Sequence, residues 1–233
     1  MPSATRIIAV RHGETDWNVD TRIQGQLDVG LNARGRWQAE QAARALADEV
    51  FDAIYASDLS RARDTALAIA AGSNARSNLR FSDQSPAQPP VQVHTGLRER
   101  AFGKFEGHTY ATIEALWPEE ARLWHIREPH FAPSDGGESP AQILERVANT
   151  VNSLAGRHLG QQILLVTHGG VLDALYRLAT RQSVNAPRTW QLGNAAINRL
   201  LWTPEGLTLV GWADTQHLDE VGMGEVGGEG STK

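Results

Sequence analysis

Two histidines occupy positions in this chain where side chains can do chemistry. Arg11 and then His12 follow an apolar run at 6–10, and His168 directly follows a second apolar run at 163–167. A glycine comes after each histidine, which lets the backbone turn sharply and approach a ligand closely. Ligands of open parallel sheets bind beyond the carboxyl ends of the strands. If the two runs form neighbouring strands, both imidazoles therefore meet in one crevice.

An anion suits this crevice better than a metal ion does. Imidazole is a common metal ligand, but Arg11 adjoins His12, and its permanent positive charge would repel a divalent cation. A guanidinium instead grips phosphate through two parallel hydrogen bonds. Arg61 offers a second guanidinium in the first turn of an expected helix, where backbone amides also favour an anion. Arg63 is its closest competitor. The residue types thus predict a phosphate site that uses no metal and no cofactor.

The elements that hold these side chains follow from the hydrophobic pattern. Uninterrupted apolar runs are typical of strands buried on both faces, and such strands form parallel sheets covered by helices. Strands are expected at 6–10, 53–57 and 163–167, with weaker candidates at 91–94 and 197–202. Helices are expected at 33–48, 59–71 and 140–155. This alternation predicts an α/β fold with a single mostly parallel sheet flanked by helices on both faces.

Capping residues mark the start of two of these helices. Asn32 is expected to cap the helix at 33–48. Ser139 and Gln142 form a capping box before the helix at 140–155, and Pro140 suits its first turn.

Composition limits the classes of function. The 233 residues include 22 Lys+Arg and 27 Asp+Glu, a net charge of −5 without the Lys/Arg stripe that duplex phosphates demand. Nucleic-acid binding is therefore not expected. The lack of cysteine excludes a disulfide scaffold, a thiolate metal site and a cysteine nucleophile. No apolar stretch approaches ~18 residues and the start of the chain does not resemble a secretory signal, which predicts a cytoplasmic protein without membrane association.

One large domain is expected at 1–218. Segment 72–90 is polar and contains prolines, which predicts a surface loop, and 104–135 is expected to be a second surface insertion. Residues 219–233 are rich in glycine and glutamate, which predicts a disordered tail.

Several short motifs follow one another between about residues 6 and 202. They are Val10-Arg11-His12-Gly13-Glu14-Thr15-Asp16-Trp17-Asn18, Gln24-Gly25, Asp28-Val29-Gly30-Leu31-Asn32 with Gly35, Ser57-Asp58-Leu59-Ser60-Arg61-Ala62, Leu97-Arg98-Glu99 with Gly103, Phe105-Glu106-Gly107, Gly136-Gly137-Glu138-Ser139, and Val166-Thr167-His168-Gly169-Gly170. In content and order this series resembles the histidine phosphatase superfamily, the phosphoglycerate mutase-like group, and its phosphatase branch in particular. Ordered motifs are far more specific than a lone Arg-His-Gly. The resemblance implies a three-layer sandwich around one sheet.

The resemblance also implies a role for each matching residue. His12 would be the nucleophile that accepts the phosphoryl group, and Glu99 would be the proton donor. The phosphate pocket would be completed by Arg11, Arg61 and His168. Further contacts to substrate or phosphate would come from Asn18, Gln24, Gly25 and Gly169.

Physical chemistry agrees with these roles. A nucleophilic imidazole must be neutral, and nearby guanidinium groups lower the pKa of a histidine such as His12. A phosphoryl group in transfer spreads negative charge over its oxygens, so fixed cations stabilise it. Glu106 is the rival carboxylate, and only the order of the motifs favours Glu99.

The other histidines lack a strand-end position and are expected to be surface or hydrogen-bonded residues: His94, His108, His125, His130, His158 and His217. Most tryptophans are expected to pack in the interior. Trp17 lies within the first motif and could line the pocket instead.

Three functions are compatible with these residues. A phosphohistidine discharged to water makes a phosphomonoesterase of small phosphorylated metabolites, whereas discharge to a retained intermediate makes a phosphoglycerate mutase. Retention needs extra cationic clamps, and the stretch at 123–129 offers only Arg127, so the phosphatase is favoured. A non-catalytic phospho-ligand-binding module is the third reading. The family resemblance also makes a homodimer an open expectation, and segments 72–90 and 104–135 would select the substrate.

Overall fold

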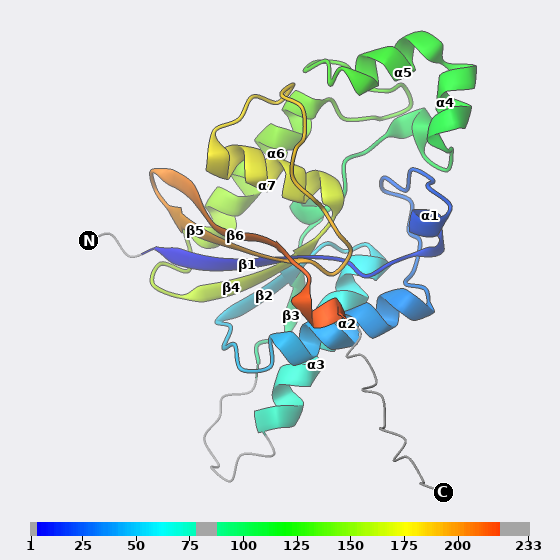
Figure 1. Ribbon diagram of the computed structural model, residues 1–233. Helices are drawn as coiled ribbons and strands as arrows, with labels where there is room; N and C mark the ends of the chain where they lie inside the picture. Colours follow the sequence, from blue (N-terminus) through cyan, green and yellow to red (C-terminus); the bar gives the residue numbers. More distant parts are fainter. Residues whose placement is uncertain (1–3, 78–87, 220–233) are drawn as a thin grey trace, which may run out of the picture.

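A six-stranded sheet runs through the computed structural model, which describes residues 4–77 and 88–219 (Figure 1). Its strands are β1 (Thr5–Arg11), β2 (Ala53–Ala56), β3 (Val91–Val93), β4 (Gln162–Thr167), β5 (Ile197–Thr203) and β6 (Gly206–Asp214). Their spatial order is β3-β2-β4-β1-β5-β6. The first four strands in this order are parallel, and β5 and β6 are antiparallel additions. The predicted mostly parallel sheet is confirmed.

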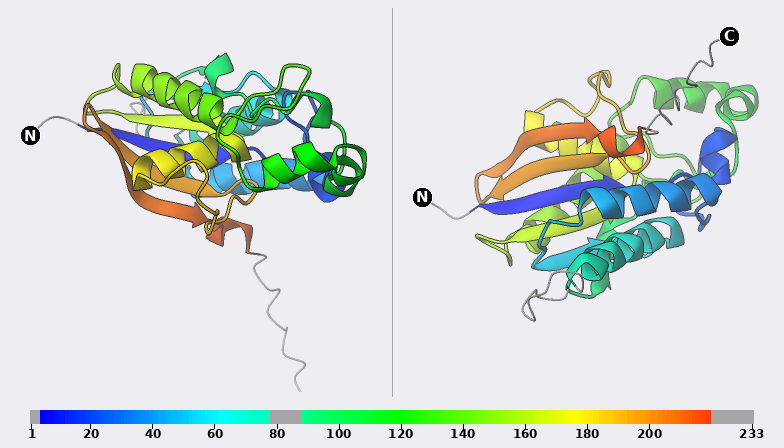
Figure 2. Two further views of the ribbon diagram at one scale, coloured as in Figure 1. Left: turned by 90° about the horizontal axis from the view of Figure 1, so that it is seen from above. Right: turned by 60° about the horizontal axis from the view of Figure 1, so that its bottom comes forward.

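Helices cover both faces of the sheet (Figures 1 and 2). They are α1 (Asp16–Val19), α2 (Ala33–Ala45), α3 (Ser60–Ser77), α4 (Tyr110–Leu116), α5 (Pro118–His125), α6 (Pro140–Ala155) and α7 (Gly169–Thr180), with short 3₁₀ turns η1 (Thr95–Leu97), η2 (Gly103–Phe105) and η3 (Gln216–Leu218). Helices α2 and α3 lie side by side on one face, and α6 and α7 on the other. Helices α4 and α5 lie beyond the end of the sheet at which β1 stops.

Successive side chains of the central strands supply two separate cores. Ile7 and Ala9 pack with α6 and α7, whereas Ile8 and Val10 pack with α2 and α3. Because side chains alternate across a strand and both faces are covered, every one of these residues is buried. This double burial explains why the strand reads as an unbroken apolar run.

The pairing of β1 with β4 brings the two histidines together. Val10 lies opposite Val166, and Arg11 lies opposite Thr167, so both strands end at the same level. His12 is the residue after β1, and His168 is the residue after β4. The backbone N–H of His12 donates to the Thr167 carbonyl at 2.9 Å, which extends the ladder into the site.

Helix boundaries differ from the prediction where tertiary contacts decide them. Helix α6 begins at Pro140 behind the expected Ser139 capping box, but α2 ends at Ala45, before residue 48. Helix α3 continues to Ser77, although a loop was expected from residue 72. A Cβ at Gly72 would lie 2.8 Å from the Cβ of Ala43, so this glycine allows close packing of α3 on α2. That contact outweighs the low helix propensity of glycine.

The insertion expected at 104–135 contains α4 and α5, which the hydrophobic pattern did not predict. Phe105, Ile113 and Ala121 form a small core of their own with Ile23. The edge strand β6 was also missed, because many of its residues are partly exposed and no continuous apolar run marks it.

The expected tail at 219–233, apart from Asp219, and most of the expected loop, 78–87, lie outside the described residues. Among the helices of the described ranges, none is long and apolar enough to cross a membrane.

Candidate active site

His12 and His168 lie ring to ring at the carboxyl edge of the sheet. Their ring centroids are 5.1 Å apart at an interplanar angle of 56°. Both residues are buried, with 2% and 0% of their surface exposed. The two imidazoles therefore meet at the carboxyl ends of neighbouring strands, as predicted.

A hydrogen bond to its own loop fixes the tautomer of His12. The Nδ1 atom lies 2.7 Å from the Gly13 carbonyl, which can only accept, so Nδ1 carries the proton. In a neutral ring the Nε2 atom then holds the lone pair. Burial, with the charges of Arg61 and Arg11, lowers the pKa of His12 well below 6.5. His12 is therefore neutral at pH 7, with Nε2 available as a nucleophile.

Two guanidinium groups flank the imidazoles and are held by backbone carbonyls. Arg61 donates from Nη1 to Leu27 at 2.9 Å and from Nη2 to Gly25 at 2.8 Å. Arg11 donates from Nη1 to the carbonyl of Leu192. The Nε atoms of both arginines are buried and find no hydrogen-bond partner within the described ranges. Burial lowers the pKa of Arg61 to about 10, which still leaves it charged at pH 7.

The sequence left Arg63 open as an alternative to Arg61. Arg63 is exposed and pairs with Asp64 at 3.4 Å, whereas Arg61 is 1% exposed and lines the cavity. The difference follows from helix geometry, because residues two apart point to different sides of α3.

His168, beside His12, has unused hydrogen-bonding capacity. Neither Nδ1 nor Nε2 has a partner among residues 4–77 and 88–219, although both atoms are buried. Burial, followed by the charges of Arg61, His12 and Arg11, lowers the pKa of His168 well below 6.5. A bound anion would reverse that electrostatic effect and supply the missing partner.

Glu99 is a carboxylate that lines this cavity. Its Oε1 accepts from the backbone N–H of Arg100 at 2.7 Å and of Gly170 at 2.9 Å, and Oε2 lies 3.1 Å from the latter. The rival Glu106 does not contribute to the cavity lining. Its Oε1 instead accepts from the N–H groups of Gln26 and Phe102 at 3.0 and 2.9 Å. Glu106 therefore braces loops, and Glu99 faces the cavity.

Asn18, Gln24, Gly25 and Gly169 all line the same cavity. The Oδ1 of Asn18 accepts from the N–H of Thr15 at 3.0 Å, which leaves its amide nitrogen to face a ligand. Gly25 has φ +52°, and a Cβ there would lie 2.0 Å from the Glu106 carboxylate. A side chain at this position would thus displace the carbonyl that holds Arg61.

The glycines after the two histidines have different tasks. A Cβ at Gly13 would lie 2.3 Å from the Gly35 carbonyl, so Gly13 serves the close approach of two backbone segments. The expectation that it approaches a ligand is corrected by this contact. A Cβ at Gly169 would meet its nearest atom, Arg11 Nε, at 3.7 Å, which is ordinary contact.

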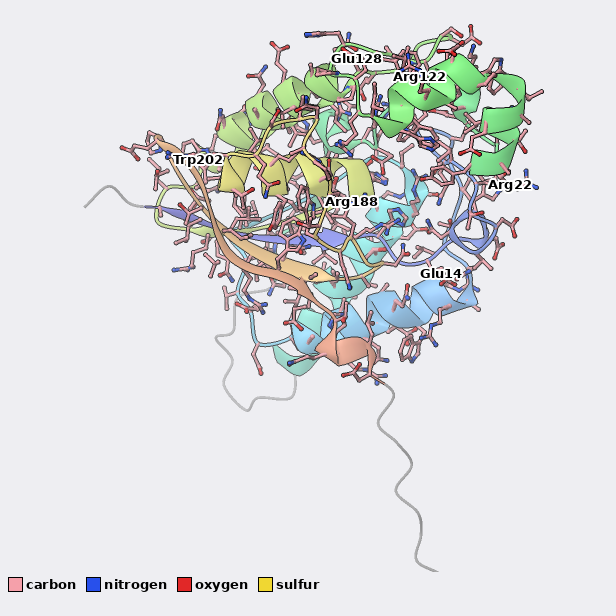
Figure 3. The ribbon with its side chains drawn as sticks, turned by 45° about the horizontal axis from the view of Figure 1, so that its top comes forward. Glu14, Arg22, Arg122, Glu128, Arg188 and Trp202 are labelled. Carbon is pink, nitrogen blue, oxygen red and sulfur yellow. The ribbon has the colours of Figure 1, made fainter. Side chains whose placement is uncertain are left out.

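The cavity has a volume of about 900 Å³ and reaches well beyond the histidines. Trp17 lines it, and so does the exposed His125, which the sequence analysis assigned to the surface or to hydrogen-bonded structure alone. Further lining residues were not singled out from the sequence: Arg100, Tyr110, Asp173, Arg188 and Trp190. Figure 3 labels Arg188, which lies on the segment between α7 and β5. The Asp173–Arg177 spacing, which suits an i,i+4 ion pair on a helix, is the signal that could have drawn attention to this end of the cavity.

Hydrogen bonds hold several of the other histidines that the structure describes. Nδ1 of His94 accepts from the Gly96 N–H at 3.1 Å, and His158 hydrogen bonds with the Tyr55 hydroxyl at 2.9 Å. In the described ranges, no group of three or more His, Asp and Glu side chains could hold a metal ion.

Comparisons with known proteins identify the family of this chain. A model of the histidine phosphatase superfamily (branch 1) matches residues 7–215. The chain is 34% identical over 230 residues to a metal-independent phosphoserine phosphatase of Arabidopsis thaliana, covering 98% of this chain and 90% of that protein. It is 34% identical over 219 residues to phosphoglycerate mutase-like protein 4 of the same plant, covering 93% and 88%. The structure of a mycobacterial glucosyl-3-phosphoglycerate phosphatase, 33% identical, superposes with a TM-score of 0.76 over 91% of this chain and 100% of that one.

Proposed function

Because this chain belongs to branch 1 of the histidine phosphatase superfamily, we propose that it hydrolyses small phosphomonoesters through a phosphohistidine formed on His12. One observation carries the proposal. The neutral Nε2 of His12 belongs to a ring packed against His168, and buried nitrogen atoms of Arg11, Arg61 and His168 have no hydrogen-bond partner in the described ranges, which supports the binding of an anion there.

In the first step the lone pair on Nε2 of His12 attacks phosphorus. The bond between phosphorus and the ester oxygen breaks, and its electron pair leaves with the alcohol oxygen. Arg11 and Arg61 stabilise the negative charge on the transferring oxygens, because their carbonyl contacts fix both guanidiniums before the substrate arrives. His168 donates to the same oxygens and gains stabilisation as a cation beside the dianion.

Glu99 supplies the proton that the leaving oxygen needs. A phosphate dianion beside this carboxyl favours its protonated form. Two backbone N–H groups hold Oε1 at 2.7 and 2.9 Å, whereas Oε2 has one longer contact of 3.1 Å to the Gly170 N–H, so Oε2 is the oxygen that presents the proton. The alcohol then departs neutral.

In the second step water attacks the phosphohistidine. Glu99, now ionised, takes one proton from this water as its oxygen bonds to phosphorus. The bond between phosphorus and Nε2 breaks, and its electron pair returns to the neutral imidazole. Inorganic phosphate and the starting enzyme result, with no metal ion required.

The proposed substrates are small phosphorylated metabolites. The relatives carry the names of phosphoserine and glucosyl-3-phosphoglycerate phosphatases. A cavity of about 900 Å³ accommodates molecules of either size.

A phosphoglycerate mutase is less well supported by the site. Arg127 was the cation of the 123–129 stretch that could clamp a retained intermediate. Its Nη2 is paired with Asp173 Oδ2 at 2.6 Å, which neutralises much of that charge. Incubation with 3-phosphoglycerate separates the two activities, because a phosphatase releases inorganic phosphate and a mutase yields 2-phosphoglycerate.

The test of the proposed function is phosphate release from a panel of phosphomonoesters. We expect turnover by the unmodified protein and its loss in His12→Ala. A folded protein that hydrolyses no ester at any pH would contradict the proposal and favour a phospho-ligand-binding module.

A further inference from the structure

The outer part of the cavity contains a carboxylate with one unused oxygen. Asp173, on α7, is 6% exposed and lines the cavity. Its Oδ2 accepts from Arg127 Nη2 at 2.6 Å and from Arg177 Nε at 3.0 Å. Its Oδ1 is buried and has no hydrogen-bond partner in the described part of the chain. A buried acceptor without a partner is costly unless a ligand satisfies it.

A donor without a partner lines the same cavity. Arg100 is 8% exposed, and its Nε donates to the Glu138 carbonyl at 2.8 Å. Its Nη2 is buried and has no partner among the described residues. Burial and the charge of Arg127 lower the pKa of Arg100 to about 10, and the charge of Asp173 is close enough to oppose this shift. An acceptor and a donor that both lack partners in the described ranges thus line the same cavity.

The chemistry of this pair selects one kind of ligand group. A hydroxyl both donates and accepts, so the hydroxyl groups of one ligand can satisfy Asp173 Oδ1 and Arg100 Nη2. An ammonium only donates, so it would leave Arg100 Nη2 without an acceptor and would meet the positive charge of Arg100. A carboxylate only accepts, and it would face the carboxylate of Asp173.

Aromatic side chains form the rest of this region. The ring of Trp190 stacks on Tyr176 with centroids 4.0 Å apart, and its buried Nε1 is a further donor without a partner in the described ranges. Tyr110 and Trp124, on α4 and α5, stack at 5.0 Å and line the cavity. Aromatic rings with polar edges suit a ligand that has both C–H and hydroxyl faces.

We propose that Asp173 and Arg100 form a hydroxyl-binding subsite, which makes polyhydroxylated phosphomonoesters the preferred substrates of this protein. The inference rests on the proposed function, since the phosphate of the same molecule would lie at His12. Asp173 and Arg100 are then specificity residues that contact the substrate away from the reacting phosphorus.

Matched phosphomonoesters test the subsite in the unmodified protein. The phosphates of glycerol, erythritol and glucose are compared with alkyl phosphates of the same lengths and with aminoalkyl phosphates. We expect kcat/KM to be at least about 10-fold higher for the best hydroxylated ester than for either partner, as for one charge-assisted hydrogen bond. Equal values, or a preference for the aminoalkyl ester, would overturn the proposal.

Asp173→Asn tests the role of the carboxylate. The single amide oxygen is expected to turn toward Arg127 and Arg177, so an N–H donor replaces the acceptor that faces the ligand. The ratio of kcat/KM between the hydroxylated and alkyl esters should fall about 10-fold. The matched control is Asp58→Asn, since Asp58 also pairs with an arginine, Arg98 at 2.6 Å, but does not contribute to the cavity lining. An unchanged ratio in folded Asp173→Asn would contradict the assignment.

Arg100→Lys provides a second variant in case Asp173→Asn does not fold. Lysine keeps the charge and can reach the Glu138 carbonyl, but it lacks the second nitrogen that would contact the hydroxyl. The same ratio should fall, and a ratio equal to that of the unmodified protein would contradict the subsite.

The two proposals fail differently. If no ester of any kind is hydrolysed, the proposed function fails, and calorimetric binding of the same ester pairs still tests the subsite. If esters are hydrolysed without regard to hydroxyl groups, only the subsite fails.

Discussion

Glu99 and Gly170 lie so close together that no side chain fits between them. The Gly170 N–H donates to Glu99 Oε1 at 2.9 Å, and a Cβ on Gly170 would lie 2.2 Å from that oxygen. The first turn of α7 therefore positions the carboxylate that the proposed mechanism needs, through a residue two positions after His168.

Gly170→Ala should displace Glu99 and slow the reaction without unfolding the protein. We expect kcat for an alkyl phosphate to fall about 100-fold, as for loss of a general acid. The loss for p-nitrophenyl phosphate should be smaller, because its leaving group departs without a proton. Gly30→Ala is the control, since no atom lies within 4 Å of a Cβ there. Equal activity of both variants on alkyl phosphates would contradict this role for the Gly170 contact.

Substitution of Glu99 should change kcat, whereas substitution of Glu106 should change the stability of the fold. Glu99→Gln should lower kcat for alkyl phosphates about 100-fold to 10,000-fold. Glu106→Gln should mainly lower the free energy of unfolding, because a neutral amide oxygen is a weaker acceptor than the carboxylate for the two backbone N–H groups that bond to Oε1. Steady-state kinetics and urea unfolding of both variants make the comparison. If Glu106→Gln alone abolished proton donation, the assignment of Glu99 would be wrong.

Arg61→Lys should impair catalysis although it conserves charge. An ammonium cannot hold two carbonyls and also present an Nε to phosphate, so kcat/KM should fall about 100-fold or more. Arg63→Lys, two residues away on the exposed side of α3, should stay within about 2-fold of the unmodified protein. Comparable losses in the two variants would remove the distinction drawn between these arginines.

The buried imidazoles should make the fold sensitive to acid. Both pKa values lie well below 6.5 in the folded protein, so below about pH 6.5 the unfolded chain binds protons that the folded chain does not. The free energy of unfolding should therefore decrease as the pH is lowered, by up to ~1.4 kcal/mol per pH unit for each histidine. Urea unfolding between pH 7.5 and 5 measures this slope.

His168→Gln should reduce the slope, because one buried titrating group is removed. His130→Gln, at an exposed position, should leave it unchanged. A slope in His168→Gln as steep as that of the unmodified protein would show that the buried ring does not titrate as stated.

Local signals predicted the parts of the fold that local interactions decide. The capping box of Ser139 and Gln142 placed the start of α6 at Pro140. Unbroken apolar runs located β1 and β4, because burial on both faces leaves that pattern. The end of α3 could not be predicted, since it depends on the fit of Gly72 against Ala43 of another helix.

In the candidate site, too, local sequence marks some residues, and only tertiary packing reveals the others. His12 and His168 could be found because strand ends and following glycines mark them. The other cavity residues could not be found in this way. Arg100 comes from the loop after β3, Asp173 from α7, and Arg188 from the segment before β5. Only the packing of these segments brings an unused acceptor and an unused donor to one cavity.

The central claim is that His12 carries the phosphoryl group during turnover. Rapid quenching of the protein with a labelled phosphomonoester, followed by peptide mapping, tests this claim most directly, and Glu99→Gln should prolong the intermediate. The account predicts acid-labile, alkali-stable phosphate on His12 and none in His12→Asn. Turnover with label on another residue, or continued labelling and hydrolysis in His12→Asn, would contradict it.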